Sequence, residues 1–221
     1  MSEKKPTGTE IPREGKLTKG QKTAKQILEA AARCIKKVGV EKTSVTNIAL
    51  EAGLKRSLIA YHFPKKAEIF YRVIVHIFEE ASLQRNEKTT GHYGRERLEN
   101  LMRSYVDFFT DNEHYFNCFL HFHYLASIDE KYRSLNDTVA NSVIEQIKIS
   151  LTELLEEVDI PVRKSLILDF SELIYHRLIG SIMRFYTTNH NQTVELYKNR
   201  YHHMLSKEID LFLYYSKSNM R

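Results

Sequence analysis

The sequence predicts an all-α protein of about nine helices, with a small N-terminal domain followed by a larger C-terminal one. Every long segment repeats its apolar residues at helical spacing, and no segment alternates convincingly as a strand would. Only four Pro and eight Gly interrupt the 221 residues, which favours long helices. The length fits one small domain plus one larger domain better than a lone binding module.

Punctuating residues set the expected helices of the N-terminal third. Apolar residues recur at helical spacing over 23–38, and Gly39 ends that segment. Thr43 and Ser44 are good N-caps for a second helix that runs to Ala52, where Gly53 breaks it. A third helix is expected over Arg56–His62 and a fourth over 65–85, with Pro64 between them.

The rest of the chain also reads as helix. The polar, Gly-containing stretch 86–94 is expected to connect the fourth helix to the fifth. Pro161 stands where a helix can begin without losing a hydrogen bond. The five later helices are expected over 95–110, 113–127, 135–158, 162–188 and 193–216.

Three parts are expected along the chain. Residues 1–20 lack apolar periodicity and hold two of the four Pro, so we interpret them as a flexible basic arm. Residues 21–67 form the first domain and residues 68–221 the second. The arm's cations are Lys4, Lys5, Arg13, Lys16 and Lys19.

Charge is unevenly distributed. Residues 1–86 hold 17 Lys and Arg against nine Asp and Glu, a net charge of +8, whereas the remainder carries −3. A basic head on a slightly acidic body is typical of proteins that bind a polyanion. Chance clustering of surface Lys would give the same numbers, so charge alone leaves both interpretations open.

Several function classes lack support in the sequence. No apolar run approaches the length of a membrane span, and the N-terminus has no signal-peptide core. Cys34 and Cys118 lie far apart in apolar patterns, which indicates reduced thiols and a cytoplasmic protein. No catalytic motif is present and no His pair has metal-ligand spacing, so we expect no enzyme activity, no metal and no cofactor.

Residues 44–63, SVTNIALEAGLKRSLIAYHF, have the pattern of a helix-turn-helix. The motif needs a small residue where its two helices cross and a turn residue that tolerates positive φ. Ala49 and Gly53 meet these needs. The apolar contacts are expected from Ile48, Leu54 and Ile59, with Ala52 beside them.

Residues 23–70 resemble the DNA-binding head of the TetR/AcrR (tetracycline-repressor) family of bacterial transcriptional regulators. The matching strings are ILEAAARCIKKVGVEKTSVTNIALEAGL and KRSLIAYHFPKKAEIF. One departure is that the family often has Tyr where Ala60 stands. The resemblance implies a homodimer that binds double-stranded DNA at a palindromic operator, and a C-terminal domain that binds a small-molecule effector and dimerises.

The resemblance and side-chain chemistry together suggest the DNA contacts. Lys55 and Arg56 are expected to contact guanine or phosphate, and Ser57 either. The other expected contacts are Tyr61 and His62 with phosphate or a thymine methyl, Ser44 and Thr46 with the backbone, and Lys66 with phosphate. Alternatively, each cation is only a solvated surface charge, and Ser44 is only an N-cap. The arm could follow phosphates or the minor groove, although disorder is the simpler interpretation.

The C-terminal part offers a candidate effector pocket and a candidate dimer interface. The aromatic segment 113–127 suggests a pocket for a largely apolar or aromatic effector, and its alternative is a dense aromatic core. The last two helices are expected to pair with a second copy, and the alternative is packing within the chain. The pocket candidates are Tyr105, Phe119, His121, Phe122, His123 and Tyr175, and the interface candidates are Phe170, Leu173, Tyr201, Leu205 and Ile209.

The expected function is therefore a sequence-specific transcriptional regulator, a repressor released from its operator when an effector binds. The alternative is a protein-interaction or nonspecific DNA-binding module that uses the same fold without ligand control. The two differ in whether the chain prefers one DNA sequence over others.

Overall fold

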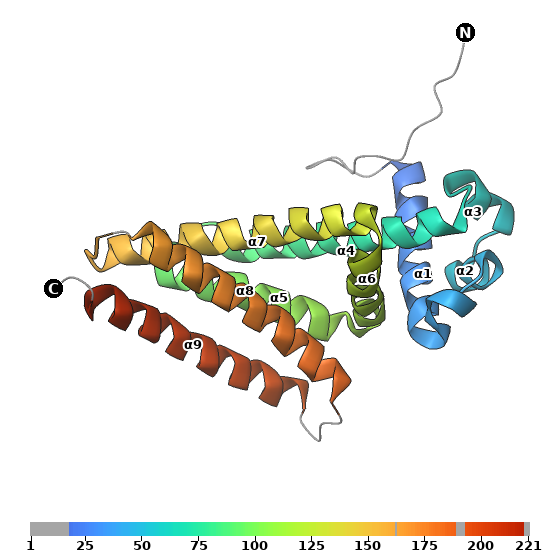
Figure 1. Cartoon of the computed structure of the whole chain (residues 1–221). Coiled ribbons are helices and arrows are strands. Elements are labelled where there is room, and N and C mark those ends of the chain that lie inside the picture. Colours follow the sequence, from blue (N-terminus) through green and yellow to red (C-terminus); the bar gives the residue numbers. More distant parts are fainter. Residues whose placement is uncertain (1–17, 162, 189–192, 219–221) are drawn as a thin grey trace, which may run out of the picture. The chain divides into compact units, whose positions relative to one another are not determined.

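The computed structural model describes residues 18–161, 163–188 and 193–218, and these residues form helices without any strand (Figure 1). The all-α prediction is confirmed. The elements are α1 (Lys19–Lys42), α2 (Val45–Ala52), α3 (Arg56–His62), α4 (Lys66–Thr89), α5 (Gly94–Asp111), the 3-10 turn η1 (Glu113–Tyr115), α6 (Phe116–Ile128), α7 (Glu130–Glu157), α8 (Lys164–Thr187) and α9 (Val194–Ser218).

The first helix begins earlier than predicted. Thr18 is its N-cap: the Thr18 hydroxyl accepts from the Gln21 N–H at 3.2 Å, and the Gln21 side chain accepts from the Thr18 N–H at 2.9 Å. This reciprocal capping box fixes residues 18–20, so the expectation that they belong to a flexible arm is wrong. Of the arm's cations, Lys19 lies in α1, whereas Lys4, Lys5, Arg13 and Lys16 lie outside the described residues.

Later helix bounds also differ from the predictions. Helix α4 continues to Thr89, through residues expected in a connection. Helix α7 begins at Glu130, five residues before the predicted start of 135, because the Asp129 carboxylate accepts from the Lys131 and Tyr132 N–H groups. The predicted helix 113–127 opens with η1, and α6 itself begins at Phe116.

The chain divides into two compact units, and the division falls inside α4. The first unit extends to Ile77 and includes the short stretch Asn117–Phe119, and the second holds Phe78–Phe116 and the chain from Leu120 onward. Residues 68–77, which we assigned to the second domain, therefore group with the first. In this stretch Ile69, Val73 and Ile77 are buried.

The first unit packs α1 against α2 and α2 against α3 around a core that includes Ile27, Ile48 and Ile59. Polar side chains of α1 hold the last turn of α2. The Gln26 amide donates to the Ala52 carbonyl at 2.7 Å. Arg33 Nε and Lys37 Nζ lie 2.9 and 2.6 Å from the two carboxylate oxygens of Glu51. These contacts fix the end of α2 just before the turn to α3.

The second unit is a helical bundle in which α5 contacts α7, α8 and α9, and α8 contacts α7 and α9. Carboxylates of α7 cap the start of α5: Glu153 accepts from the Gly94 N–H and Glu157 from the Arg95 N–H, each at 3.1 Å. Negative charge at a helix N-terminus stabilises the helix dipole. Among the described residues, no helix is both long enough and apolar enough to cross a membrane.

The Glu51 ion pairs should stabilise the first unit in a pH-dependent way. Hydrogen bonds from Lys37 and then Arg33 lower the pKa of the Glu51 carboxyl below its ordinary value near 4.5. A lowered pKa in the folded state contributes stability above that ordinary value, and the contribution disappears as pH falls through the lowered one.

We therefore expect Glu51→Gln to reduce the protection of α2 amides against hydrogen exchange by about 1 kcal/mol at pH 7, because both partners are partly exposed. The difference from wild type should shrink below pH 4.5. Glu41→Gln, a change at an exposed carboxylate of α1, is the control and should have little effect. Equal protection of the Glu51 variant and the control at pH 7 would refute this account.

Candidate DNA-binding surface

The turn between α2 and α3 is the local feature that sets the surface. Gly53 has φ 64° and ψ 31°, in the left-handed region that glycine adopts without a Cβ penalty. The turn closes with hydrogen bonds from the Gly53 N–H to the Leu50 carbonyl at 3.2 Å and from the Leu54 N–H to the Ala49 carbonyl at 2.9 Å. This short connection directs α3 away from α2 at a fixed angle.

A capping box begins α2. The Ser44 hydroxyl accepts from the Asn47 N–H at 3.1 Å, and the Asn47 side chain accepts from the Ser44 N–H at the same distance. Thr43, the other predicted cap, instead ends α1 and donates its hydroxyl to the Gly39 carbonyl. Ser44 thus acts as the N-cap, and the neighbouring Thr46 is exposed.

Helix α3 turns one polar face to solvent, and we call Lys55, Arg56, Ser57 and Tyr61 the α3 face. All four are exposed, Tyr61 by 72% of its surface, whereas Ile59 on the opposite side is fully buried. Among the described residues, no carboxylate forms an ion pair with Lys55 or Arg56. The face therefore carries positive charge that the fold itself does not neutralise.

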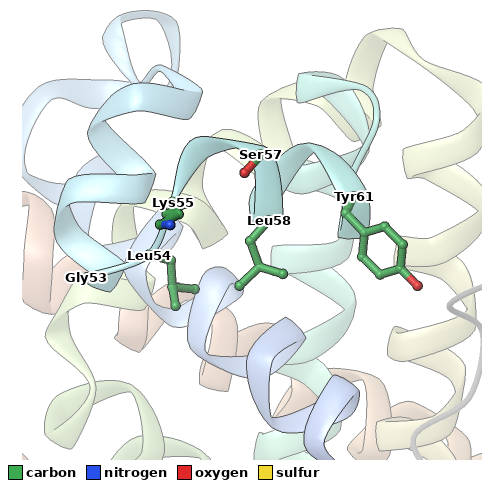
Figure 2. Close-up of a pocket in the computed structure, with 6 residues that line it drawn as sticks. All are labelled: Gly53, Leu54, Lys55, Ser57, Leu58 and Tyr61. Atoms are coloured by element: carbon green, nitrogen blue, oxygen red, sulfur yellow. The ribbon is translucent and has the colours of Figure 1, made fainter.

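An apolar hollow of about 500 Å³ lies beside this face. Figure 2 shows Leu54 and Leu58 on the same side of the chain, while Ser57 points the other way and Tyr61 extends outward. Leu54, predicted to be buried, is only partly so. The hollow can accept an apolar group such as a thymine methyl, and the adjoining Lys55 and Ser57 can donate hydrogen bonds.

Two further predicted contacts lie at the edge of the α3 face. His62 is half-buried, and its ring lies 5.4 Å from the ring of Tyr61 in an edge-to-face arrangement. Lys66 is the first residue of α4 and is exposed, and its ammonium donates to the Glu41 carbonyl at 3.2 Å. In this conformation Lys66 contacts the end of α1.

Sequence reasoning missed two residues of this surface. Leu50 on α2 is 77% exposed, although it is large and apolar, and Leu58 lines the hollow on α3. The position of Leu50 could have revealed it, because Ile48, Ala49 and Ala52 define the buried side of α2 and Leu50 lies outside that side.

The segment that carries this surface resembles known proteins. Residues 27–73 match the model of the bacterial regulatory proteins of the tetR family. Over 59 residues the chain is 41% identical to the HTH-type transcriptional regulator TtgR of Pseudomonas putida. Residues 27–73 therefore resemble the N-terminal part of TetR-family regulators. The TtgR alignment spans 27% of this chain and 28% of TtgR, so most of both chains lies outside it.

Solved structures extend the likeness to the whole fold. A bacterial regulatory protein of the tetR family from Rhodococcus RHA1 superposes with a TM-score of 0.65 and 15% identity, over 85% of this chain and 97% of that one. A structure from Saccharomonospora viridis, determined in complex with choline, gives a TM-score of 0.65 at 20% identity, over 81% and 93%. These similarities show the TetR fold. The family model and TtgR describe regulators rather than enzymes, in agreement with our expectation.

The predicted effector residues do not form one cluster within a single unit. Phe119 groups with the first unit and the others with the second. In the second unit Phe122 is fully buried, and burial lowers the pKa of His123, which favours its neutral form. His121 is half-buried. Tyr124 is 59% exposed, so the aromatic segment is not buried on every side as expected.

Tyr105 lies on α5 and Tyr175 on α8, both in the second unit. The Tyr105 hydroxyl is buried and accepts from Arg85 at 2.8 Å. Burial raises the pKa of Tyr175 to about 12, and the nearby Tyr105 makes a smaller contribution in the same direction. Both phenols are therefore protonated at neutral pH and can serve as hydrogen-bond donors.

Most of the predicted interface residues are buried in the single chain. Phe170, Tyr201, Leu205 and Ile209 are at most 8% exposed, so they pack inside the second unit and have no free surface for a second copy. Leu173 is 48% exposed and stays available. The stripe on the last two helices faces its own bundle, which was the alternative interpretation. The described residues contain no group of three or more potential metal ligands.

The left-handed turn predicts the effect of adding a single methyl group. Gly53→Ala places a Cβ in the left-handed region, which costs roughly 1–2 kcal/mol although no atom obstructs it. Gly20→Ala, at an ordinary helical position, should instead be neutral or stabilising. Urea denaturation of both variants checks this, and a Gly53→Ala protein as stable as wild type would show that the turn carries no strain.

Proposed function

We propose that this chain is a homodimeric transcriptional regulator that binds a palindromic operator and is released when a small-molecule effector binds. The observation that carries the proposal is the α3 face: exposed cations without internal partners, on a short helix held at a fixed angle by Gly53. The proposed location is the cytoplasm, and Cys34 and Cys118 are free and buried.

Helix α3 would enter the major groove with its first residues against base edges. Lys55 and Arg56 stand at its start, and an Arg at this place can bond guanine in a bidentate manner. Ser57 and Tyr61 adjoin them. Ser44, Thr46, His62 and Lys66 are proposed to contact the backbone, where they set the register of the head rather than the sequence.

Dimerisation would use exposed apolar residues of α8 and α9. Leu168 and Leu173 are exposed on α8, and Leu211, Tyr214 and Tyr215 on α9. Exposed large apolar residues on two neighbouring helices favour an interface in soluble proteins. Two heads are needed because one half-site gives too little contact for tight specific binding, and adjacent half-sites lie about 34–36 Å apart.

The effector is proposed to bind in the second unit, near Tyr105, Phe122, His123 and Tyr175, and to be largely apolar or aromatic. The choline complex of the Saccharomonospora viridis structure supports a ligand site in this fold. Release requires the effector to favour the dimer conformation whose heads no longer match the operator, so the effect is a shift of population.

Binding to DNA can be tested with a palindromic sequence from upstream of the gene. Arg56→Ala should weaken specific binding by about 1–3 kcal/mol, and Lys66→Ala should weaken all DNA binding and reduce the salt slope by about 1. Lys207→Ala on α9 is the matched control and should bind as wild type. The measurement is a gel shift at several salt concentrations.

The alternative function makes the opposite prediction in the same experiment. A protein-interaction or nonspecific DNA-binding module would show salt-driven binding with no preference for the palindrome over scrambled DNA. Unchanged specific binding by Arg56→Ala would remove the proposed role of the α3 face.

The dimer interface can be tested by introducing charge. Leu211→Asp or Tyr214→Asp should raise the dimer dissociation constant by about tenfold or more, because a buried unpaired carboxylate is costly. Leu83→Asp on α4, also at an exposed apolar position, should leave the dimer intact. Sedimentation equilibrium gives the constants, and an unaffected dimer in both α9 variants would place the interface elsewhere.

A further inference from the structure

The second unit contains a groove that the proposed function does not use. It lies between the end of α8 and the start of α9 and has a volume of about 380 Å³. We call it the α8–α9 groove. Its lining includes Ser181, Arg184, Phe185, Tyr197, Arg200 and Tyr201. The volume falls within the range of sites that hold small molecules.

Aromatic rings form the apolar part of the groove. The rings of Phe185 on α8 and Tyr197 on α9 lie 4.3 Å apart and are tilted by 30°, so they form a continuous wall across the two helices. Tyr201 is 5% exposed and lies one turn beyond Tyr197. A flat apolar molecule would bury surface against these rings.

The cations of the groove lack the compensation that their neighbours have. Arg177 on α8 pairs with Glu208, and Lys198 on α9 lies 3.1 and 2.9 Å from Asp107 and Asp111. By contrast, Arg184 and Arg200 form no ion pair within the described chain. Both are exposed and line the same groove. Two uncompensated guanidinium groups beside an aromatic wall suit an anion.

A third group points to a ligand acceptor. The Tyr197 hydroxyl is buried and has no hydrogen-bond partner among the described residues. Burial raises the pKa of Tyr197, so the hydroxyl keeps its proton and can donate. A buried donor without an acceptor is unusual in native proteins and costs stability, which an acceptor atom of a ligand would restore.

We propose that the α8–α9 groove binds a small aromatic carboxylate. Its ring would lie against Phe185 and Tyr197, and its carboxylate would lie between Arg184 and Arg200. A carboxylate oxygen would also accept a hydrogen bond from the Tyr197 hydroxyl. The residues that line the groove are not among the proposed effector residues or the proposed dimer contacts Leu168, Leu173, Leu211 and Tyr214, although the groove lies on the same two helices as those contacts. Binding at the groove does not require DNA, so its test is independent of operator recognition.

The experiment is isothermal titration calorimetry of the full chain with 2-naphthoate. Its neutral isostere 2-naphthamide should bind about tenfold more weakly, because its uncharged carbonyl cannot form an ion pair with the guanidinium groups. Arg184→Gln and Arg200→Gln should each weaken 2-naphthoate binding by about tenfold. Lys207→Gln, which removes an exposed cation farther along α9, should leave binding unchanged.

Tyr197→Phe separates a binding role from a structural one. It should weaken 2-naphthoate binding several-fold without lowering the melting temperature, because the lost hydroxyl has no partner in the protein. Equal affinities for 2-naphthoate and 2-naphthamide, or unchanged binding in both Arg variants, would overturn the proposal. Binding of inorganic phosphate alone would overturn the aromatic class. If a second copy fills the groove, 2-naphthoate will not bind, and the Arg184→Gln/Arg200→Gln double variant will change its oligomeric state. This result would also overturn the proposal.

Discussion

The turn at Gly53 is the constraint on which the head depends. Its left-handed conformation ends α2 within one residue and sets the direction in which α3 leaves. Side chains of α1 hold the residues just before this turn: Gln26 bonds the Ala52 carbonyl, and two cations pair with Glu51. The end of α2 is thus fixed from two sides, which pre-organises α3 and reduces the ordering cost of binding.

Charge compensation distinguishes the surfaces of the chain. In the second unit several cations have a carboxylate partner, as Lys88 and Lys198 have Asp107, and Arg97 has Glu153. The α3 face has no such partners in the described chain. The net charge of the N-terminal third alone left two interpretations open, polyanion binding and chance clustering of surface Lys. The cations without partners on the α3 face favour polyanion binding. Charge that a fold leaves uncompensated is available to a polyanion.

Local signals made the head predictable. The limits of α2 and α3 follow from Ser44, Gly53 and Pro64, each of which acts on its own neighbours, and the structure has α3 over the predicted Arg56–His62. The start of α7 was missed although its signal, the capping residue Asp129, is equally local. The start of α1 after its N-cap Thr18 was also missed, because the capping box lies in a polar stretch without apolar periodicity.

Non-local features could not be predicted in this way. An apolar stripe on a helix shows that the stripe is covered, but not whether its own chain or a second copy covers it. Phe170, Tyr201, Leu205 and Ile209 are covered within their own unit, whereas Leu173 is exposed. The spacing of the stripe did not distinguish these cases. The shape of the α8–α9 groove likewise depends on how two helices pack against each other, which their separate sequences do not show.

The central claim is that α3 reads the major groove in two copies. Dimethyl sulfate interference on the bound palindrome tests it most directly, because the reagent methylates guanine N7 in the major groove and adenine N3 in the minor groove. If α3 enters the major groove in two copies, interference is expected at guanine N7 in two symmetric clusters, about one helical turn or a small multiple apart. Interference only at adenine N3, or in a single cluster, would contradict it.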